Sequence, residues 1–265
     1  MTSMDDIRRL YDRQQRIEID YAGVRREVTP LVVRQIDATF GHGTVIYSQL
    51  DETNADETIR AEVAYFTTLG VVEHLEWKLF DYDQPADLKD RLIARGFEPE
   101  DPDAVLILDL AEIPPELMQP ITHDVRRIDD PARLDDVRAI TQAVWGGEDD
   151  GWIIDALAST LRDKPEELSI YVAYVDGIPA SYGRIDFHEG NAFAGLWGGS
   201  TLPEYRQRGL YTALVAVRAQ EAIRRGVRYL TIDASPMSRA VLEKYGFRLM
   251  AYAWACNYRI EPDEA

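Results

Sequence analysis

The sequence predicts an α/β protein with mixed β-sheets flanked by helices, divided into two consecutive domains. Apolar, β-branched segments alternate with amphipathic segments along both halves of the chain. A proline-rich stretch from Ile113 to Ile121 separates the halves, and proline disrupts both helices and strand ladders. The segment from Thr201 to Asp233 has the pattern strand, helix, strand, a crossover that joins parallel strands. We therefore expect domains at 1–112 and 120–265.

The first half is expected to open with a helix from Met4 to about Ile19, because Ser3 is placed to cap it and Asp5 and Asp6 suit its first turn. The other expected elements are strands at 30–36 and 44–50 around a Gly41-His42-Gly43 turn, a helix from Asp56 to near Gly70, a strand at 75–80, a helix at 87–95 stopped by Gly96, and a strand at 104–110.

The second half is expected to contain a longer series, in which Asp176-Gly177 is a strong hairpin signal. The expected elements are a strand at 125–128, helices at 132–144 and 152–162, strands at 169–175, 180–187 and 192–201, a helix at 209–225, a strand at 228–233, a helix at 237–244, and two strands within 246–260.

The composition limits the binding partners and the cellular compartment that can be expected for the protein. Of 265 residues 46% are hydrophobic, which is enough for a packed core, and the formal net charge is -18. Such a charge repels a nucleic-acid backbone and favours cationic small molecules, although solubility alone also explains it. Cys256 is the single cysteine, so neither an internal disulfide nor a thiolate zinc cluster forms. No apolar run approaches a membrane span. We expect a cytoplasmic protein with no metal, nucleic-acid or membrane partner; a homodimer stays open.

The most informative segment runs from Thr201 to Leu214. It leaves a strand, turns through a basic loop with a glycine, and enters an amphipathic helix. The first amides of a helix have no intrahelical partner and carry the positive end of its dipole, so a diphosphate fits there. Gly209 lets the backbone approach the phosphates, and Arg206 and Arg208 add positive charge.

This loop resembles the signature of the GNAT family of acyl-CoA N-acyltransferases, Arg/Gln-x-x-Gly-x-Gly/Ala. Arg206 and Gly209 match it, after the Pro-x-Tyr of 203–205 that often precedes it. Tyr211 occupies the last small position, a departure that crowds the loop. A second stretch, Ser235 to Phe247, resembles the family pattern Asn-x-x-Ala-x-x-Leu-Tyr-x-x-x-Gly-Phe, with serine in place of asparagine. The resemblance covers roughly 125–258.

The resemblance implies a GNAT fold and transfer of an acetyl or other acyl group from acetyl-CoA, as co-substrate, to an amine of a small molecule or peptide. It implies these cofactor-binding residues: Thr201, Leu202, Gln207, Arg208, Gly209, Leu210, Tyr211, Thr212 and Ser235. The family often uses a tyrosine as general acid, and its position corresponds to Leu242, which has no proton to give. A non-catalytic acyl-CoA-binding or interaction protein is therefore the alternative.

The first half resembles a degenerate copy of the same fold, giving two tandem GNAT-like domains. Its Gly96-Phe97 corresponds to Gly246-Phe247 of the second half. The segment from Asp51 to Asp56 stands where the phosphate loop belongs, and it is acidic and lacks glycine, so it should repel a diphosphate. Shared patterning of unrelated α/β segments is the alternative explanation.

Acyl transfer to an amine needs a base and an oxyanion donor. The base candidates are Glu148 and Asp150, with Asp149 between them, in a segment flanked by Trp145 and Trp152. Helix capping explains Asp149 or Asp150 equally well, and the tryptophans suit either an acceptor wall or the core. Asp186 and Asp233 are weaker base candidates. Gly198-Gly199 suits a strand distortion that frees a backbone amide, or simply close packing.

Overall fold

The computed structural model describes residues 2–21, 23–146 and 151–260. The chain divides into two compact units, one made of Met1–Val105 with Leu249–Ala265 and the other of Leu106–Arg248. The first unit is thus built from two separate stretches of chain. From the sequence we expected residues 120–265 to form one domain, whereas the residues after Arg248 belong to the first unit.

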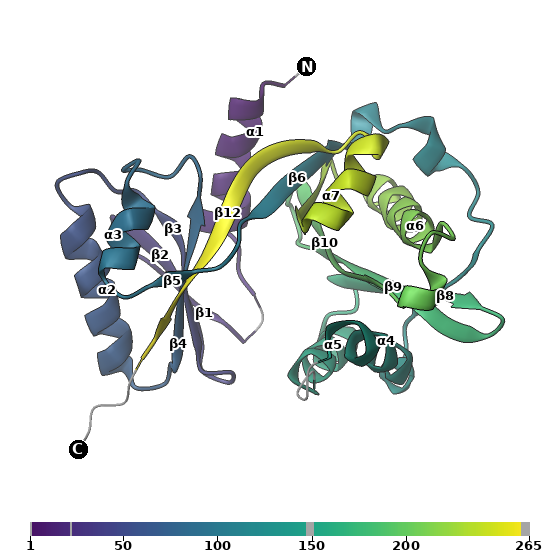
Figure 1. Cartoon of the computed structure of the whole chain (residues 1–265), viewed down its shortest axis with the longest axis horizontal. Helices are drawn as coiled ribbons and strands as arrows, with labels where there is room; N and C mark the ends of the chain where they lie inside the picture. Colours follow the sequence, from purple (N-terminus) through teal and green to yellow (C-terminus); the bar gives the residue numbers. More distant parts are fainter. Residues whose placement is uncertain (1, 22, 147–150, 261–265) are drawn as a thin grey trace. The chain divides into compact units, whose positions relative to one another are not determined.

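The first unit has strand order β1-β2-β3-β4-β12, with β5 added on β12. Of the pairs described, β3–β4 is parallel and the others are antiparallel. Helices α2 and α3 lie together on one side of the sheet (Figure 1). The elements are α1 (Met4–Tyr11), the π-helix η1 (Asp12–Ile17), β1 (Arg25–Val28), β2 (Val32–Asp37), β3 (His42–Ser48), α2 (Ala55–Leu69), β4 (His74–Phe80), α3 (Leu88–Ala94), β5 (Glu98–Pro99), β6 (Asp103–Asp109), which crosses the unit boundary, and β12 (Arg248–Arg259).

A buried ion pair ties η1 to this sheet. The Arg16 side chain is 1% exposed and donates to both carboxylate oxygens of Asp83, at 2.9 and 2.7 Å, and to Asp12 at 2.9 Å. Its guanidinium also donates to the carbonyl of Ile46 and lies 4.2 Å from the centre of the Phe80 ring. These contacts satisfy a cation that burial alone would make very costly.

The second unit contains β11-β10-β9-β8-β7 in that order, with β10–β11 parallel and the other pairs antiparallel. Helices α4 and α5 cover one face of this sheet and α6 covers the other (Figure 1). The elements are β7 (Asp124–Ile128), α4 (Asp135–Trp145), α5 (Gly151–Asp163), β8 (Leu168–Val175), β9 (Ile178–Phe187), β10 (Phe193–Thr201), α6 (Leu210–Arg224), β11 (Tyr229–Ala234) and α7 (Pro236–Leu242), with short 3-10 turns between several of them.

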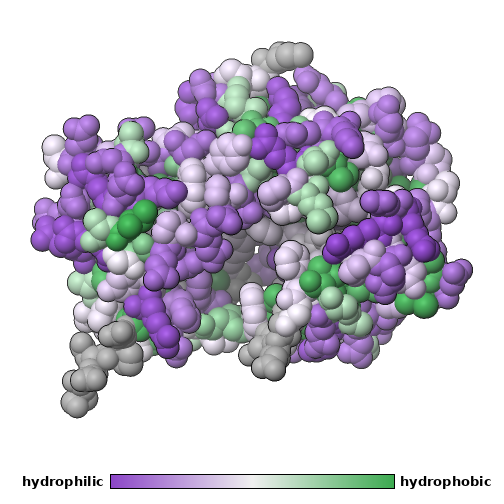
Figure 2. Space-filling view, in the orientation of Figure 1, coloured by the Kyte–Doolittle hydropathy of each residue, from purple (hydrophilic) through white to green (hydrophobic). Residues whose placement is uncertain are grey.

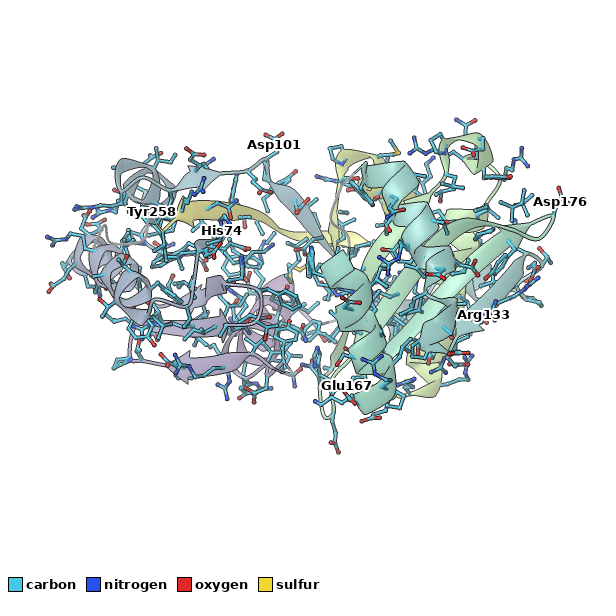
Figure 3. The ribbon with its side chains drawn as sticks, turned by 90° about the horizontal axis from the view of Figure 1, so that it is seen from below. His74, Asp101, Arg133, Glu167, Asp176 and Tyr258 are labelled. Atoms are coloured by element: carbon cyan, nitrogen blue, oxygen red, sulfur yellow. The ribbon has the colours of Figure 1, made fainter. Side chains whose placement is uncertain are left out.

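Most predicted elements are present, including the Ser3 cap, which accepts from the Asp6 amide. The Asp176-Gly177 hairpin is confirmed: both residues have positive φ, 52° and 80°, and Asp176 stands at the tip of the turn (Figure 3). Two predictions were wrong. The first helix changes to π geometry at Asp12, and the two strands expected within 246–260 are one long strand, β12. Strands β1 and β5 were not predicted.

The surface and the helices of the described residues can be compared with the partners expected from the sequence. Hydrophilic side chains cover most of the face seen in Figure 2. Within residues 2–21, 23–146 and 151–260, no helix is long and apolar enough to cross a membrane. Over the same residues, no cluster of three or more histidine, cysteine, aspartate or glutamate side chains is arranged to hold a metal ion.

Candidate active site

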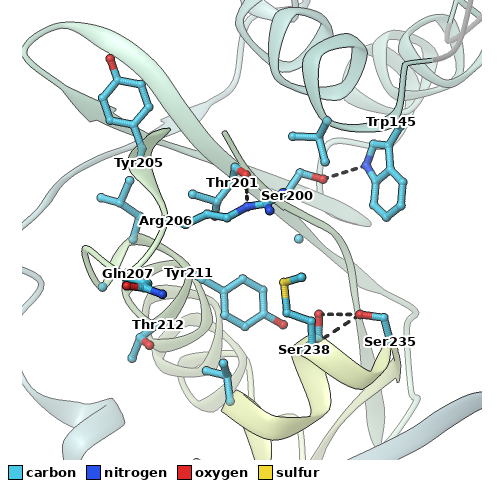
Figure 4. Close-up of a pocket in the computed structure, with 16 residues that line it drawn as sticks. Trp145, Ser200, Thr201, Tyr205, Arg206, Gln207, Tyr211, Thr212, Ser235 and Ser238 are labelled. Atoms are coloured by element: carbon cyan, nitrogen blue, oxygen red, sulfur yellow. Dashed lines mark hydrogen bonds between the residues drawn. The ribbon is translucent and has the colours of Figure 1, made fainter. Parts of the chain in front are cut away.

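A cavity of about 820 Å³ opens in the second unit beside the amino end of α6 (Figure 4). Its lining comes from the end of α4, the last residues of β10, the loop and first turn of α6, and α7. The lining residues are Val144, Trp145, Gly199, Ser200, Thr201, Tyr205, Arg206, Gln207, Gly209, Leu210, Tyr211, Thr212, Ser235, Met237, Ser238 and Val241.

The cavity exists because β10 and β11 diverge. Their parallel pairing is confined to Phe193–Gly195 against Tyr229–Thr231, although β10 continues to Thr201 and β11 to Ala234. The parallel crossover predicted from the sequence is therefore confirmed. The pairing of β10 with β9 also shifts between Trp197 and Ser200, which is a β-bulge. Divergence and bulge together leave backbone groups of β10 without a neighbouring strand on the cavity side.

The amino end of α6 is suited to an anion. Gly209 is its N-cap residue, with φ 77°, and no side chain caps the helix. The amides of the first turn, at Leu210, Tyr211 and Thr212, therefore have no intrahelical acceptor and line the cavity. Gln207 also has a positive φ, 61°, so the loop turns twice in the left-handed region before the helix begins.

Of the nine cofactor-binding residues predicted from the sequence, all but Leu202 and Arg208 line this one cavity. Leu202 donates its amide to the carbonyl of Ala180 and packs partly buried beneath α4 and α5. The Arg208 guanidinium lies 5.2 Å from the Tyr205 ring, and its carbonyl is 3.0 Å from Nε2 of His123. The base candidates Glu148, Asp149 and Asp150 lie outside the described residues. Binding and catalysis by these residues stay predictions.

The distortion predicted at Gly198-Gly199 is confirmed, and so is the close packing offered as its alternative. Gly198 has φ 67°, and a Cβ there would lie 2.5 Å from the Tyr182 hydroxyl. A Cβ on Gly199 would lie 2.9 Å from the Tyr211 ring. The bulge thus fits between two tyrosine rings, and only glycine leaves room for both.

Trp145 forms part of the cavity wall. Its indole Nε1 donates to the Ser200 hydroxyl at 2.9 Å, which links the end of α4 to the bulge (Figure 4). The Trp145 side chain stays 68% exposed, so it is no core residue. Trp152 is 52% exposed and does not line this cavity. Of the two tryptophans considered from the sequence, only Trp145 is positioned to contact a ligand here.

The groups considered for proton transfer are distributed differently from expectation. Leu242 is fully buried, and Tyr245 does not line the cavity. Asp186 lies outside the cavity on β9, opposite Gly195 of β10. Burial raises the pKa of Asp186, although the nearby Arg184 charge opposes this. Tyr211, considered from the sequence only as a crowding residue, places its hydroxyl inside the cavity lining (Figure 4).

In the corresponding loop of the first unit, a carboxylate of the loop itself accepts hydrogen bonds from the backbone amides. Oδ1 of Asp51 accepts from the amides of Thr53 and Asn54, at 2.8 and 3.1 Å, and from the Thr53 hydroxyl. The Asp56 carboxylate, in the first turn of α2, pairs with Arg91 and Arg95. An anion approaching this loop would therefore meet two carboxylates that already have partners. Repulsion of a diphosphate by this loop stays a prediction.

The two units nevertheless share local geometry. In each, a parallel pair of strands is joined through one helix, β3–α2–β4 and β10–α6–β11. In each, a later short helix ends at a glycine of positive φ followed by a buried phenylalanine, Gly96-Phe97 and Gly246-Phe247. The phenylalanine amide donates five residues back in both cases, to Leu92 and Leu242. These matches support the relation between the halves.

Comparison with known proteins finds a family model that matches most of the second unit. The model of the Acetyltransferase (GNAT) family matches residues 134–247. A GCN5-related N-acetyltransferase from Kribbella flavida is 16% identical over 94% of each chain, with a TM-score of 0.67. A tandem GNAT protein from the clavulanic acid biosynthesis pathway is 16% identical, over 94% of this chain and 87% of that one, with a TM-score of 0.62.

A functionally unknown conserved protein from Staphylococcus epidermidis has the same fold over 92% of this chain and 99% of its own, at 12% identity and a TM-score of 0.69. No curated protein matches the chain. At these identities the structural neighbours show the fold alone, and that fold extends over both units.

Proposed function

We propose that this chain, whose residues 134–247 match the model of the Acetyltransferase (GNAT) family, transfers an acyl group from acetyl-CoA to the amine of a small molecule or peptide. The observation that carries this proposal is the cavity where the uncapped end of α6 meets the diverging end of β10. It brings the uncapped amino end of a helix and the part of β10 that extends beyond its pairing with β11 into one 820 Å³ space, which suits a long phosphorylated thioester.

Each part of the cavity has a role in this proposal. The amides of Leu210, Tyr211 and Thr212 hold the diphosphate of CoA. A backbone amide of the bulge, between Gly198 and Ser200, donates to the thioester oxygen as it becomes an oxyanion. The amine attacks the carbonyl only after losing its proton, because an alkyl ammonium titrates near pH 10. Turnover is therefore expected to rise with pH.

The acceptor is proposed to be a cationic amine, because the chain has a net charge of -18 and three adjacent carboxylates, 148–150, follow the cavity-lining Trp145 in sequence. A panel of cationic, neutral and anionic amines, assayed by thiol released from acetyl-CoA, tests this. Cationic amines are expected to give the highest kcat/KM. Better turnover with neutral or anionic acceptors would contradict the assignment.

A non-catalytic acyl-CoA-binding protein is the second candidate, favoured by the buried Leu242 at the position of the usual acid. The same panel separates the two candidates. Binding of acetyl-CoA by calorimetry, with no thiol release for any amine or peptide, would favour the binding protein.

The CoA site is tested by a matched pair of substitutions at Gly209. Asparagine and aspartate both tolerate the left-handed backbone and have nearly the same shape. Gly209→Asp sets a negative charge against the diphosphate, at an energy of a few kcal/mol for charges about 4 Å apart. Calorimetry is expected to show acetyl-CoA binding at least 10-fold weaker for Gly209→Asp than for Gly209→Asn. Equal affinities in the two folded variants would overturn the site.

A further inference from the structure

Packing against the bulge accounts for the ring of Tyr211 but not for its hydroxyl group. Tyr211 lies in the first turn of α6, and its ring passes beside the bulge, where the absent Cβ of Gly199 makes room for it. The hydroxyl points toward Ser238 on α7 (Figure 4). It is buried and has no well-formed hydrogen bond to the described part of the chain, the Ser238 hydroxyl being the polar group beside it.

A hydroxyl in this state is costly. A buried polar group without a full hydrogen bond destabilises a protein by about 1–3 kcal/mol, and phenylalanine would fill the same space without that cost. The hydroxyl is therefore best explained by a partner that arrives with the ligand. Because the ring is adjacent to Gly199, that partner lies next to the bulge, where the thioester carbonyl and its sulfur are placed in the proposed function.

The surroundings keep this hydroxyl protonated. Burial raises the pKa of Tyr211, and this effect is only partly offset by the charge of Arg218 and by Ser238. Arg218 lies two turns further along α6, is fully buried, and donates to the carbonyls of Leu214 and Arg184. Desolvation lowers the pKa of Arg218 to about 10, so it stays cationic near neutral pH. A neutral phenol beside a buried cation can donate a proton and then carry negative charge.

We propose that Tyr211, given the acyl transfer proposed above, is the general acid that protonates the departing sulfur of CoA. The amine nitrogen forms a bond to the acyl carbon, and the carbon–sulfur bond breaks with its electron pair on sulfur. The Tyr211 proton passes to that sulfur, giving free thiol and a tyrosinate. The attacking nitrogen releases one proton as the amide forms, and the tyrosinate takes up that proton. The cycle therefore consumes no other reactant. Here a residue of the phosphate-loop helix supplies the acid that Leu242 lacks.

Tyr211→Phe tests this role. Loss of a general acid typically costs 10²- to 10⁴-fold, and a thiolate needs less help than poorer leaving groups. We therefore expect kcat to fall about 10- to 100-fold, with unchanged calorimetric affinity for acetyl-CoA and a melting temperature no lower than that of the wild type. The solvent deuterium isotope effect on kcat should also shrink, which a packing role would not produce.

Tyr245→Phe is the matched control, because Tyr245 is a half-buried tyrosine outside the cavity lining. It is expected to leave kcat and the isotope effect unchanged. If the wild type turns over and Tyr211→Phe keeps its rate, the role of Tyr211 is refuted while the proposed function stands. If the wild type binds acetyl-CoA but acylates no acceptor, the proposed function itself fails, and the acid role fails with it.

Discussion

Asp83→Asn is expected to lower the free energy of unfolding of the first unit by about 3–5 kcal/mol, as breaking buried ion pairs does. Asp83 accepts two hydrogen bonds from Arg16, and their side chains are 4% and 1% exposed. Burial lowers the pKa of Arg16, but the charge and hydrogen bonds of Asp83 outweigh this and raise it, so the guanidinium stays charged at any working pH. Asparagine keeps the shape but leaves that buried charge with Asp12 as its remaining carboxylate partner.

Denaturation in urea, followed by fluorescence of the buried Trp77 in the same unit, measures this loss. Asp87→Asn is the control, because Asp87 pairs with Arg91 at 2.9 Å but is 54% exposed. Exposed pairs contribute about 0–1 kcal/mol. Losses of equal size in the two variants would show that the Arg16 pair does not hold the π-helix on the sheet.

Gly198→Ala is expected to reduce kcat by about 100-fold or more while acetyl-CoA still binds. The new methyl would meet the Tyr182 hydroxyl at 2.5 Å, at a backbone φ of 67° that side chains rarely adopt. The bulge must then shift, and the backbone amide assigned to the oxyanion loses its direction. Removing one such donor typically costs 10²- to 10³-fold in kcat. Steady-state kinetics with an accepted amine, together with calorimetry, separate this from a loss of binding.

Gly177→Ala controls for backbone strain. Gly177 has φ 80° in the β8–β9 hairpin, and a Cβ added there would meet no atom of the described residues within 4 Å. The variant should lose roughly 1–2 kcal/mol of stability from the left-handed backbone and keep its kcat. A Gly198→Ala variant with the kinetics of Gly177→Ala would remove the bulge from the mechanism.

Local signals explain how much of the fold was predictable. Ser3, Gly70, Gly96 and Gly246 end or begin helices through contacts with residues only a few positions away, so a sequence read in short windows contains the information. The amino end of α6 is equally local, because Gly209 and the amides that follow it form the proposed anion site among themselves. The acidic character of the loop at Asp51 is likewise evident from its composition, although repulsion of a diphosphate there stays a prediction.

The features that were missed depend on residues far apart in sequence. The change to π geometry places Arg16 on Asp83, 67 positions away, and no local pattern encodes that pair. The hydrogen bond from Trp145 to Ser200 spans 55 positions. A catalytic role for the Tyr211 hydroxyl can be argued only from the contact between its ring and Gly199. Strand β12 was placed with the wrong unit because its apolar residues suit either core.

Strand β12 has a consequence for the order in which the protein is made. Its residues 253–259 pair with β4, and Cys256 and Ile260 complete the core around Trp77 and Leu92. The ribosome makes these residues only after the whole of the second unit, long after the rest of the first unit has emerged. The first unit therefore cannot complete its fold, and the β4 edge stays unpaired, while the continuous second unit 106–248 is already able to fold. Cutting the gene at the proline-rich stretch would deprive the first half of this strand in the same way.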